Sequence, residues 1–243
     1  MDLAEANLLI AAEASDGLDM ASALAHVEGL AQAAREAGVV PTLRDQGFTG
    51  ATDDYDDPRN SFLHEVLESR RGLPIALATL ALAVAARIGA PMAGVGLPGH
   101  FLVADTSGPE PVYIDPFSGW VLRDAADCAE LVESTAGIPF RMEHLAPVSD
   151  RAILARTLLN LRGSYMRRRR LDQALWTVEV GLIVAPHDAR LIHGSVVLLA
   201  GAGRYDDAEA AAAAFLAARP DDPMAPALEE QMRTVADLRG RMN

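Results

Sequence analysis

The residues best suited to chemistry are a histidine and an aspartate, each at one end of a short apolar run. His100 precedes the apolar residues 101–103, and Asp115 follows residues 112–114. Short apolar runs bounded by Gly, Pro and Asp indicate strands. An aspartate that holds an imidazole in one tautomer is the orienting half of a catalytic triad, in which the imidazole activates a nucleophile. No nucleophile accompanies this pair in the sequence.

The two strands are predicted to pair antiparallel about a turn near residues 107–108. That register places His100 opposite Asp115, with their Cβ atoms roughly 4.5–5.5 Å apart. A slip of two residues would keep both side chains on one face but make them diagonal neighbours, about 7–8 Å apart. Two prolines in the turn leave the choice open. The first register also pairs Phe101 with Ile114, Leu102 with Tyr113 and Val103 with Val112.

Helices are predicted to form a scaffold around these strands. Apolar residues recur at helical spacing over residues 2–14 and about 19–37. Residues 74–88 begin with a proline, which suits the first turn of a helix, and are apolar nearly all round, so this helix should be buried. A buried helix followed by antiparallel strands predicts an α+β fold, with helices packed on a small antiparallel sheet. Smaller elements are expected at 92–95 (strand), 121–122 (strand) and about 124–134 (helix).

Charge and composition exclude several partners. The chain has 243 residues, a net charge of −13 and a pI near 4.8, whereas nucleic acid and anionic membranes attract basic surfaces, so we expect neither as a partner. The four arginines at 167–170 are interpreted as a solvated helix end. Cys128 is the only cysteine, so the chain contains no disulfide framework. Without a recognisable leader or spanning segment, we expect a soluble cytoplasmic protein.

Two groups of polar residues partly match metal sites. The loop at 42–57 ends in four aspartates, but it lacks the closing glutamate of an EF-hand loop. His64 and Glu65 are similar to part of a zinc-protease helix whose second histidine is absent. We therefore expect no metal and no cofactor.

The C-terminal part of the chain contains a repeat of 34 residues. The segment LDQA at 171–174 recurs as YDDA at 205–208, and APHD at 185–188 recurs as RPDD at 219–222. This is the period of the tetratricopeptide repeat, which is a pair of helices. A closing helix is expected at about 224–239. We therefore expect a first domain at 1–147, with its core at about 55–123, and an all-α repeat region at 148–243.

Five motifs resemble those of the bacterial SirB-type proteins. The resemblance covers most of the chain and implies a transglutaminase-like domain, a papain-related Cys-His-Asp fold, followed by tetratricopeptide repeats. It implies much less about activity. The motifs, in chain order, are DPRNSFL at 57–63, EVLE at 65–68, RGLPI at 71–75, PGHFLV at 98–103 and IDPF at 114–117.

The resemblance also implies where a catalytic cysteine would lie. Counting back from Gly89 by the helix length of the superfamily gives Pro74 or a residue next to it, and proline has neither a thiol nor a backbone N–H. Cys128 could replace the thiol only if its helix folded back over the hairpin. A free cysteine is commonly a small buried hydrophobe, so His100 and Asp115 are interpreted as a remnant pair.

The role of that pair has two open interpretations. In one, it is a structural hydrogen bond that locks the hairpin. In the other, His100 is an acid/base or binding group in a pocket, because a histidine–aspartate pair suits either role. The pocket would be shared with Asn60, Glu65, Arg71 and Pro74.

Three functions are compatible with the sequence. The one we favour is a protein- or peptide-binding adaptor without a catalytic thiol, which grips a protein segment through its repeats and the His100 pocket. The second is a hydrolase or acyl transferase in which His100 and Asp115 act with water or another nucleophile. The third is a structural partner subunit. Neither the ligand nor the oligomeric state follows from the sequence.

Overall fold

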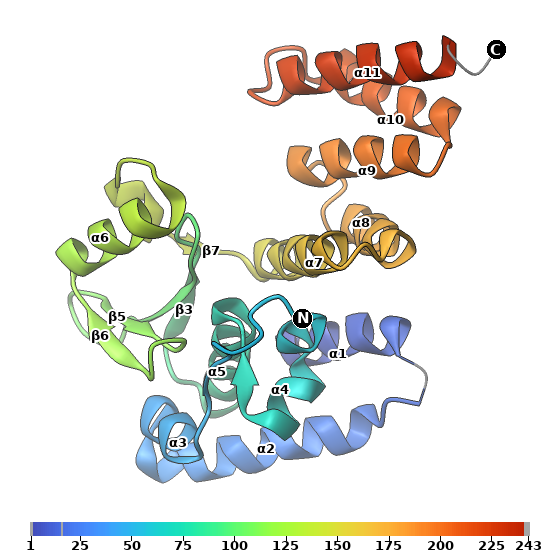
Figure 1. The fold of residues 1–243 in the computed structure, drawn as a ribbon. Helices are drawn as coiled ribbons and strands as arrows, with labels where there is room; N and C mark the ends of the chain where they lie inside the picture. Colours follow the sequence, from blue (N-terminus) through green and yellow to red (C-terminus); the bar gives the residue numbers. More distant parts are fainter. Residues whose placement is uncertain (1, 16, 241–243) are drawn as a thin grey trace. The chain divides into compact units, whose positions relative to one another are not determined.

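The computed structural model describes residues 2–15 and 17–240, which form two compact units, Met1–Thr157 and Leu158–Asn243 (Figure 1). The boundary falls inside a helix, later in the chain than position 148, where we expect the repeat region to begin. In the described part of the chain, no helix combines the length and the apolar character needed to cross a bilayer.

Helix α5 (Pro74–Ile88) is the centre of the first unit. Its bounds are those predicted. Apolar residues, mostly alanine and leucine, occupy nearly every face of this helix, so nearly all of its side chains are buried. The helix ends at Gly89, whose φ of 69° suits glycine. A short 3₁₀ turn, η1 (Pro58–Ser61), precedes the last of the surrounding helices. The helices around α5 are α1 (Leu3–Ala14), α2 (Met20–Ala37), α3 (Val39–Asp45) and α4 (Leu63–Ser69).

A small antiparallel sheet lies beside this helical layer, which confirms the predicted α+β fold (Figure 1). Its strand order is β6-β5-β4-β3-β7, and α5 packs against β3 and β4. Helix α6 (Ala125–Ala136) contributes Cys128 and Val132 to an apolar cluster with residues of β3 and β4. A 3₁₀ turn, η2 (Met142–Leu145), leads to the last strand. The strands are β3 (Met92–Val95), β4 (Leu102–Asp105), β5 (Val112–Asp115), β6 (Val121–Arg123) and β7 (Pro147–Val148).

The register of β4 and β5 differs by two residues from the one that places His100 opposite Asp115. Val103 pairs with Ile114, and Ala104 pairs with Tyr113. The loop between the strands is therefore centred one residue later in the chain than expected. The pairing of Val103 with Val112 was wrong, and the slip of two residues that the turn prolines left open is the one observed.

A second, two-stranded sheet has no counterpart in the sequence-based expectation. Strands β1 (Thr49–Gly50) and β2 (Arg71–Gly72) pair in parallel, with Gly50 facing Gly72. Two-residue strands carry too little periodicity to be recognised in a sequence. Their importance is positional, because β2 leads directly into the start of α5.

The second unit is built of helices in the part of the chain that the structure describes. Helix α7 (Asp150–Arg167) begins in the first unit and ends in the second, and the starts of α8 and α10, Leu171 and Tyr205, are one repeat of 34 residues apart. This confirms the predicted repeat region. The remaining helices are α8 (Leu171–Val184), α9 (Ala189–Gly201), α10 (Tyr205–Ala218) and α11 (Ala225–Gly240).

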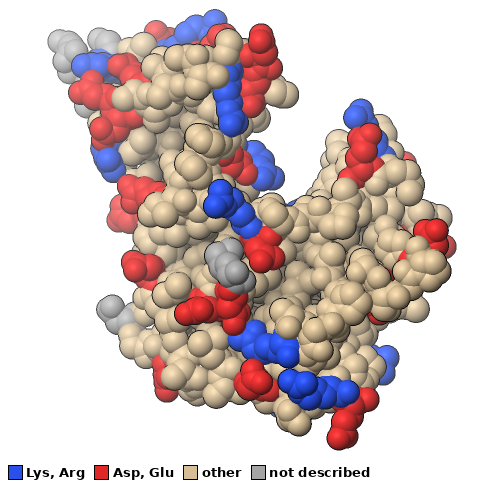
Figure 2. Space-filling view, turned by 180° about the vertical axis from the view of Figure 1, so that it is seen from behind, with Lys and Arg blue, Asp and Glu red and all other residues tan. Residues whose placement is uncertain are grey.

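Charge is divided unequally between the units. Residues 1–157 contain 10 arginines and 23 acidic residues, whereas residues 158–243 contain 11 of each, and the chain has no lysine. The whole net charge of −13 therefore belongs to the first unit. On the face shown in Figure 2, acidic and basic side chains are interspersed rather than sorted into broad areas of one sign.

Candidate functional site

His100 lies in the tight turn that connects β3 to β4. Its backbone N–H donates to the carbonyl oxygen of Leu97 at 3.1 Å, and Gly99 between them has a φ of +76°. A Cβ at position 99 would lie 2.5 Å from Oγ1 of Thr135 on α6. Only glycine therefore fits both the backbone conformation and the close approach of α6.

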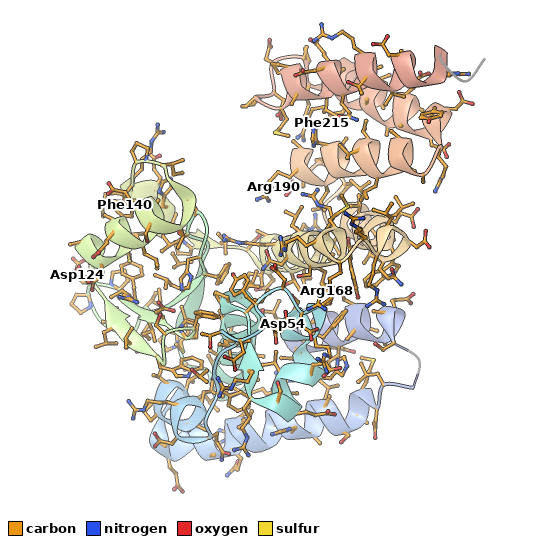
Figure 3. The ribbon with its side chains drawn as sticks, viewed as in Figure 1. Asp54, Asp124, Phe140, Arg168, Arg190 and Phe215 are labelled. Atoms are coloured by element: carbon orange, nitrogen blue, oxygen red, sulfur yellow. The ribbon has the colours of Figure 1, made fainter. Side chains whose placement is uncertain are left out.

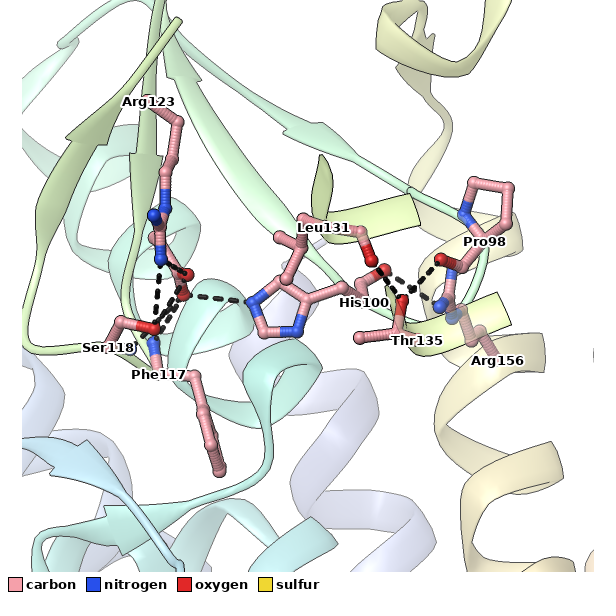
Figure 4. Close-up of polar contacts among 9 residues, drawn as sticks. Pro98, His100, Phe117, Ser118, Arg123, Leu131, Thr135 and Arg156 are labelled. Atoms are coloured by element: carbon pink, nitrogen blue, oxygen red, sulfur yellow. Dashed lines mark hydrogen bonds and ion pairs between the residues drawn. The ribbon is translucent and has the colours of Figure 1, made fainter. Parts of the chain in front are cut away.

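The structure brings His100 and Asp115 into direct contact. Nε2 of His100 lies 2.9 Å from Oδ1 of Asp115. A dashed line from the imidazole marks this contact in Figure 4. Only 7% of His100 and none of Asp115 is exposed. The imidazole also meets the ring of Phe117 edge-on, with their centroids 6.0 Å apart. Among the described residues, Nδ1 of His100 has no hydrogen-bond partner.

The carboxylate of Asp115 is fully used as an acceptor. Besides His100, Oδ1 accepts the backbone N–H of Phe117 at 3.1 Å and that of Ser118 at 3.2 Å. Oδ2 accepts the hydroxyl of Ser118 at 2.8 Å and Nη2 of Arg123 at 3.1 Å (Figure 4). Burial by itself raises the pKa of Asp115, but His100 and Ser118 outweigh it and hold that pKa far below its ordinary value.

Ser118 and Arg123 are site residues that the sequence analysis missed. Ser118 belongs to an Asx-type turn in which Asp115 accepts N–H groups two and three residues later, a pattern that an aspartate before proline can signal. Arg123 lies on β6, the strand that pairs with the Asp115 strand β5. No local sequence pattern indicates that Arg123 contacts Asp115. Its guanidinium offsets the negative charge of Asp115 on the side away from His100.

Arg156 of α7 holds the turn that carries His100. Its Nη2 donates to the carbonyl oxygens of Leu97 and His100, both at 2.8 Å. Figure 4 shows the contact with His100. The guanidinium also lies over the ring of Phe101, 5.5 Å from the ring centroid. One arginine therefore clamps both ends of the turn, a long-range contact that the sequence did not reveal.

Pro74 is the first residue of α5, so the position expected for a cysteine contains a residue without an N–H group. It is buried. Strand β2, which precedes Pro74, is connected through β1 to Phe117, the residue whose ring contacts His100. Gly50 pairs with Gly72, and the N–H of Gly50 donates to the carbonyl oxygen of Phe117 at 3.1 Å.

The remaining residues of the expected pocket are only partly brought together. Asn60 and Arg71 line the same cleft of about 250 Å³, where Asn60 donates to the carbonyl oxygen of Asp54 at 2.6 Å. Glu65 lies elsewhere, with Oε1 3.8 Å from Nε2 of His64. The residues that line the cleft are Ala51, Thr52, Asp53, Asp54, Asp57, Arg59, Asn60 and Arg71, so it includes neither Glu65, Pro74 nor His100.

Cys128 does not supply the absent thiol. It is fully buried in the apolar cluster between α6 and the sheet, and burial raises its pKa to about 11. Its sulfur makes no hydrogen bond to His100. A neutral, enclosed thiol packs as a small hydrophobe. Across the described residues, no group of three or more His, Cys, Asp or Glu side chains is arranged to hold a metal ion.

Curated relatives match much of this chain. It is 41% identical over 133 residues to a UPF0162 protein of Xylella fastidiosa, which is 53% of this chain and 47% of that protein, so the match spans about half of the Xylella relative. It is 29% identical over 192 residues to a UPF0162 protein of Vibrio cholerae, covering 78% of this chain and 71% of the relative. A UPF0162 protein of Pseudomonas aeruginosa is 30% identical over 207 residues, covering 77% and 76%.

Two family models cover the two units in turn. A tetratricopeptide-repeat model matches residues 161–233. No solved structure matches the chain. The model described as the transglutaminase-like superfamily matches residues 19–159, which is more than half of the sequence. The chain therefore belongs to the transglutaminase-like superfamily and to the UPF0162 family.

Proposed function

We propose that the chain is a SirB-type adaptor that binds a protein or peptide, with a transglutaminase-like domain that works without a catalytic thiol. The observation that carries this proposal is the start of α5 at Pro74, where the superfamily resemblance expects the cysteine. Proline supplies neither a nucleophile nor an N–H donor for an oxyanion. The only thiol, Cys128, is enclosed and has a raised pKa.

The state of the histidine–aspartate pair supports a binding or structural use of this domain. Asp115 accepts five hydrogen bonds and is fully buried. A polar network in which the acceptor is fully satisfied stabilises one arrangement of the chain. Here it joins the β5–β6 turn to the loop before β4. The pair therefore stabilises the conformation of these two loops.

The repeats supply the second part of the proposal. Tetratricopeptide units stack into solenoids whose extended surfaces bind protein segments. In the second unit, α8, α9 and α10 border a mainly apolar cavity of about 370 Å³ that includes Ile192, Ala214 and Phe215. Phe215 belongs to α10 and is labelled in Figure 3 on the side of that helix toward α9. An apolar segment of a partner would find a complementary surface there.

The test compares partner capture by the full chain with capture by variants. Ala214→Glu places a charge in the apolar cavity, whereas Ala213 is also exposed but does not line it, so Ala213→Glu is the matched control. We expect the direct partner, confirmed with the purified protein, to be lost only with Ala214→Glu. We also expect no transfer of a labelled amine onto glutamine peptides. A partner set that is the same in all variants and in His100→Gln, with an altered peptide profile, would contradict the adaptor function.

One observation favours a second candidate function, hydrolysis or acyl transfer with water or another nucleophile. Nδ1 of His100 makes no hydrogen bond to the described residues, while Nε2 is held by Asp115. An imidazole oriented in this way can accept a proton at its other nitrogen. Turnover of an ester or amide substrate by the full chain, lost in His100→Gln but unaffected by Cys128→Ser, would favour this function.

A further inference from the structure

A second cavity in the repeat unit is lined by basic and apolar side chains. It has a volume of about 290 Å³ and lies between α7 and α9. None of the residues around it is acidic. They are Arg162, Gly163, Met166, Arg167, His193, Gly194, Val197 and Leu198.

Arg162 differs from other arginines of this unit in its pairing. Arg190, labelled in Figure 3 at the start of α9, forms an ion pair with Asp188 at 2.6 Å. Arg204 pairs with Asp207 at 2.8 Å. Half-buried Arg162 makes no ion pair with the described residues, and its Nη1 donates to the carbonyl oxygen of Arg190 at 3.0 Å. Asp188, which is paired with Arg190, attracts the Arg162 guanidinium from beyond ion-pair distance, but burial and the charge of Arg190 outweigh it and lower the pKa of Arg162. A half-buried cation without an ion-paired carboxylate is unfavourable unless an anion accompanies it.

Two glycines make room for the guanidinium groups. A Cβ at Gly194 would collide with Nη1 of Arg162, so the guanidinium occupies the space that a side chain at 194 would fill. On the facing helix, a Cβ at Gly163 would lie 3.2 Å from Nη1 of Arg167. Half-buried Arg162 therefore lies along a bare stretch of α9, whereas Arg167, which also lines the cavity, is exposed to solvent. The close approach to Gly194 places the planar guanidinium of Arg162 at the cavity.

The other groups in the cavity reinforce the preference for an anion. Burial and the neighbouring charge of Arg162 lower the pKa of His193, which shows that a further cation is unfavourable there. The unit as a whole is electrically balanced, with 11 arginines and 11 acidic residues in 158–243. The gathering of basic groups is therefore local to the cavity. Its remaining walls, Met166, Val197 and Leu198, are apolar.

We propose that this cavity binds a carboxylate of an acidic peptide segment, with Arg162 as the principal contact and the apolar walls receiving an aliphatic neighbour of the acidic residue. The guanidinium fork matches the geometry of a carboxylate, and a charge-assisted hydrogen bond in a half-buried site is stronger than a neutral one. The proposal rests on the adaptor function and names the chemistry of its partner. It does not involve the larger, apolar cavity beside Phe215.

Peptide pools test this chemistry with the full chain. Two pools of fluorescein-labelled pentapeptides alternate aliphatic residues with glutamate in one pool and glutamine in the other, and fluorescence anisotropy measures binding. We expect the glutamate pool to bind at least about tenfold more tightly, with an affinity that falls as salt is added. Each pool is also prepared with an amidated C-terminus. If amidation abolishes the binding, the carboxylate is the terminal one, and otherwise it belongs to a side chain.

Variants locate the binding. Arg162→Met removes the cation, whereas Gly194→Ala keeps every charge and displaces the guanidinium. We expect both to weaken binding of the glutamate pool at least about tenfold. Gly201→Ala on the same helix, where a Cβ meets nothing within 4 Å, and Arg204→Gln outside the cavity are the matched controls and should bind like the wild type. Circular dichroism and thermal unfolding confirm that each variant is folded.

Three results would overturn the proposal. Equal affinity for the two pools that persists when both are amidated would refute the carboxylate while leaving peptide binding by the adaptor intact. An equal loss with Arg204→Gln would show diffuse attraction to charge instead of a site. If neither pool binds, the proposal also fails, and the partner-capture experiment then decides the adaptor function separately.

Discussion

His100 and Asp115 touch across a diagonal of the sheet. Nε2 of the histidine lies 2.9 Å from Oδ1 of the aspartate, although the register of Val103 with Ile114 puts position 115 opposite position 102. His100 belongs to the turn that its N–H closes with Leu97, and β4 begins only at Leu102. The direction of the imidazole is therefore not set by the alternation of side chains along β4. The two side chains thus make contact although diagonal neighbours in a sheet have Cβ atoms about 7–8 Å apart.

Asp115→Asn should lower the free energy of unfolding by about 3 kcal/mol at pH 7, because it leaves His100 and Arg123 without a buried anion. The pKa of Asp115 in the folded chain is below its ordinary value of 3.8. Its stabilisation is therefore complete well above pH 3.8 and is lost as the pH falls below that value.

Denaturant unfolding of wild type and Asp115→Asn from pH 7 to pH 3 measures this effect. The difference should be constant at neutral pH and shrink below about pH 4. Asp45→Asn, at an aspartate whose side chain is 71% exposed, is the control and should change little. A difference that stays the same down to pH 3 would show that the charge of Asp115 is not what stabilises the fold.

Much of the scaffold could be predicted because its signals are long and regular. The apolar helix from Pro74 to Ile88 and the 34-residue spacing between Leu171 and Tyr205 each depend on many residues that agree. The β4–β5 register depends on the conformation of a six-residue turn, where two prolines give no single preferred pairing. Its error of two residues kept the correct face, because side chains alternate with a period of two.

The site itself was less predictable because distant elements build it. Ser118 could be found from the turn chemistry of Asp115, but Arg123 and Arg156 reach the site from another strand and from α7. Arg71 and Asn60 meet in one cleft, whereas Glu65, only five residues after Asn60, lies on α4 beside His64. The change from η1 to α4 between them separates their side chains.

Arg156→Met should loosen the turn that carries His100. The substitution keeps most of the side-chain volume but removes two hydrogen bonds from a cation to the carbonyl oxygens of Leu97 and His100. We expect a loss of about 2 kcal/mol in unfolding free energy and faster amide exchange at residues 97–101. Arg151→Met, an exposed arginine on the same helix, should change neither quantity. Unaltered exchange in the turn would mean that α7 does not hold it.

Pro74→Cys tests whether the scaffold can still activate a thiol. In a Cys128→Ser background, we expect iodoacetamide to modify Cys at position 74 slowly at pH 7, because burial restricts access and opposes the thiolate. Ser69→Cys, at the exposed end of α4, provides a rapidly labelled reference. Labelling at position 74 that is faster than this reference, and that is lost with His100→Gln, would show that the ancestral geometry survives.

Two features require glycine at position 99 beside His100: its left-handed backbone conformation and the close approach of Thr135. Comparing Gly99→Ala with Gly119→Ala should separate their contributions to stability. Gly99 and Gly119 have nearly the same conformation, with φ of +76° and +78°, but a Cβ at 99 would meet Thr135, whereas one at 119 would meet nothing within 4 Å. Gly119→Ala therefore measures the left-handed conformation alone, about 1 kcal/mol, while Gly99→Ala should cost about 3 kcal/mol because the contact with α6 is added.

A double mutant then identifies the contact. Thr135→Ala removes the Oγ1 that would lie 2.5 Å from the new Cβ, so it should recover part of the stability lost in Gly99→Ala. Thermal unfolding measures all four combinations. If Gly99→Ala and Gly119→Ala cost the same, α6 yields to the added methyl group. The position of His100 would then depend on Arg156 and Asp115 without support from α6.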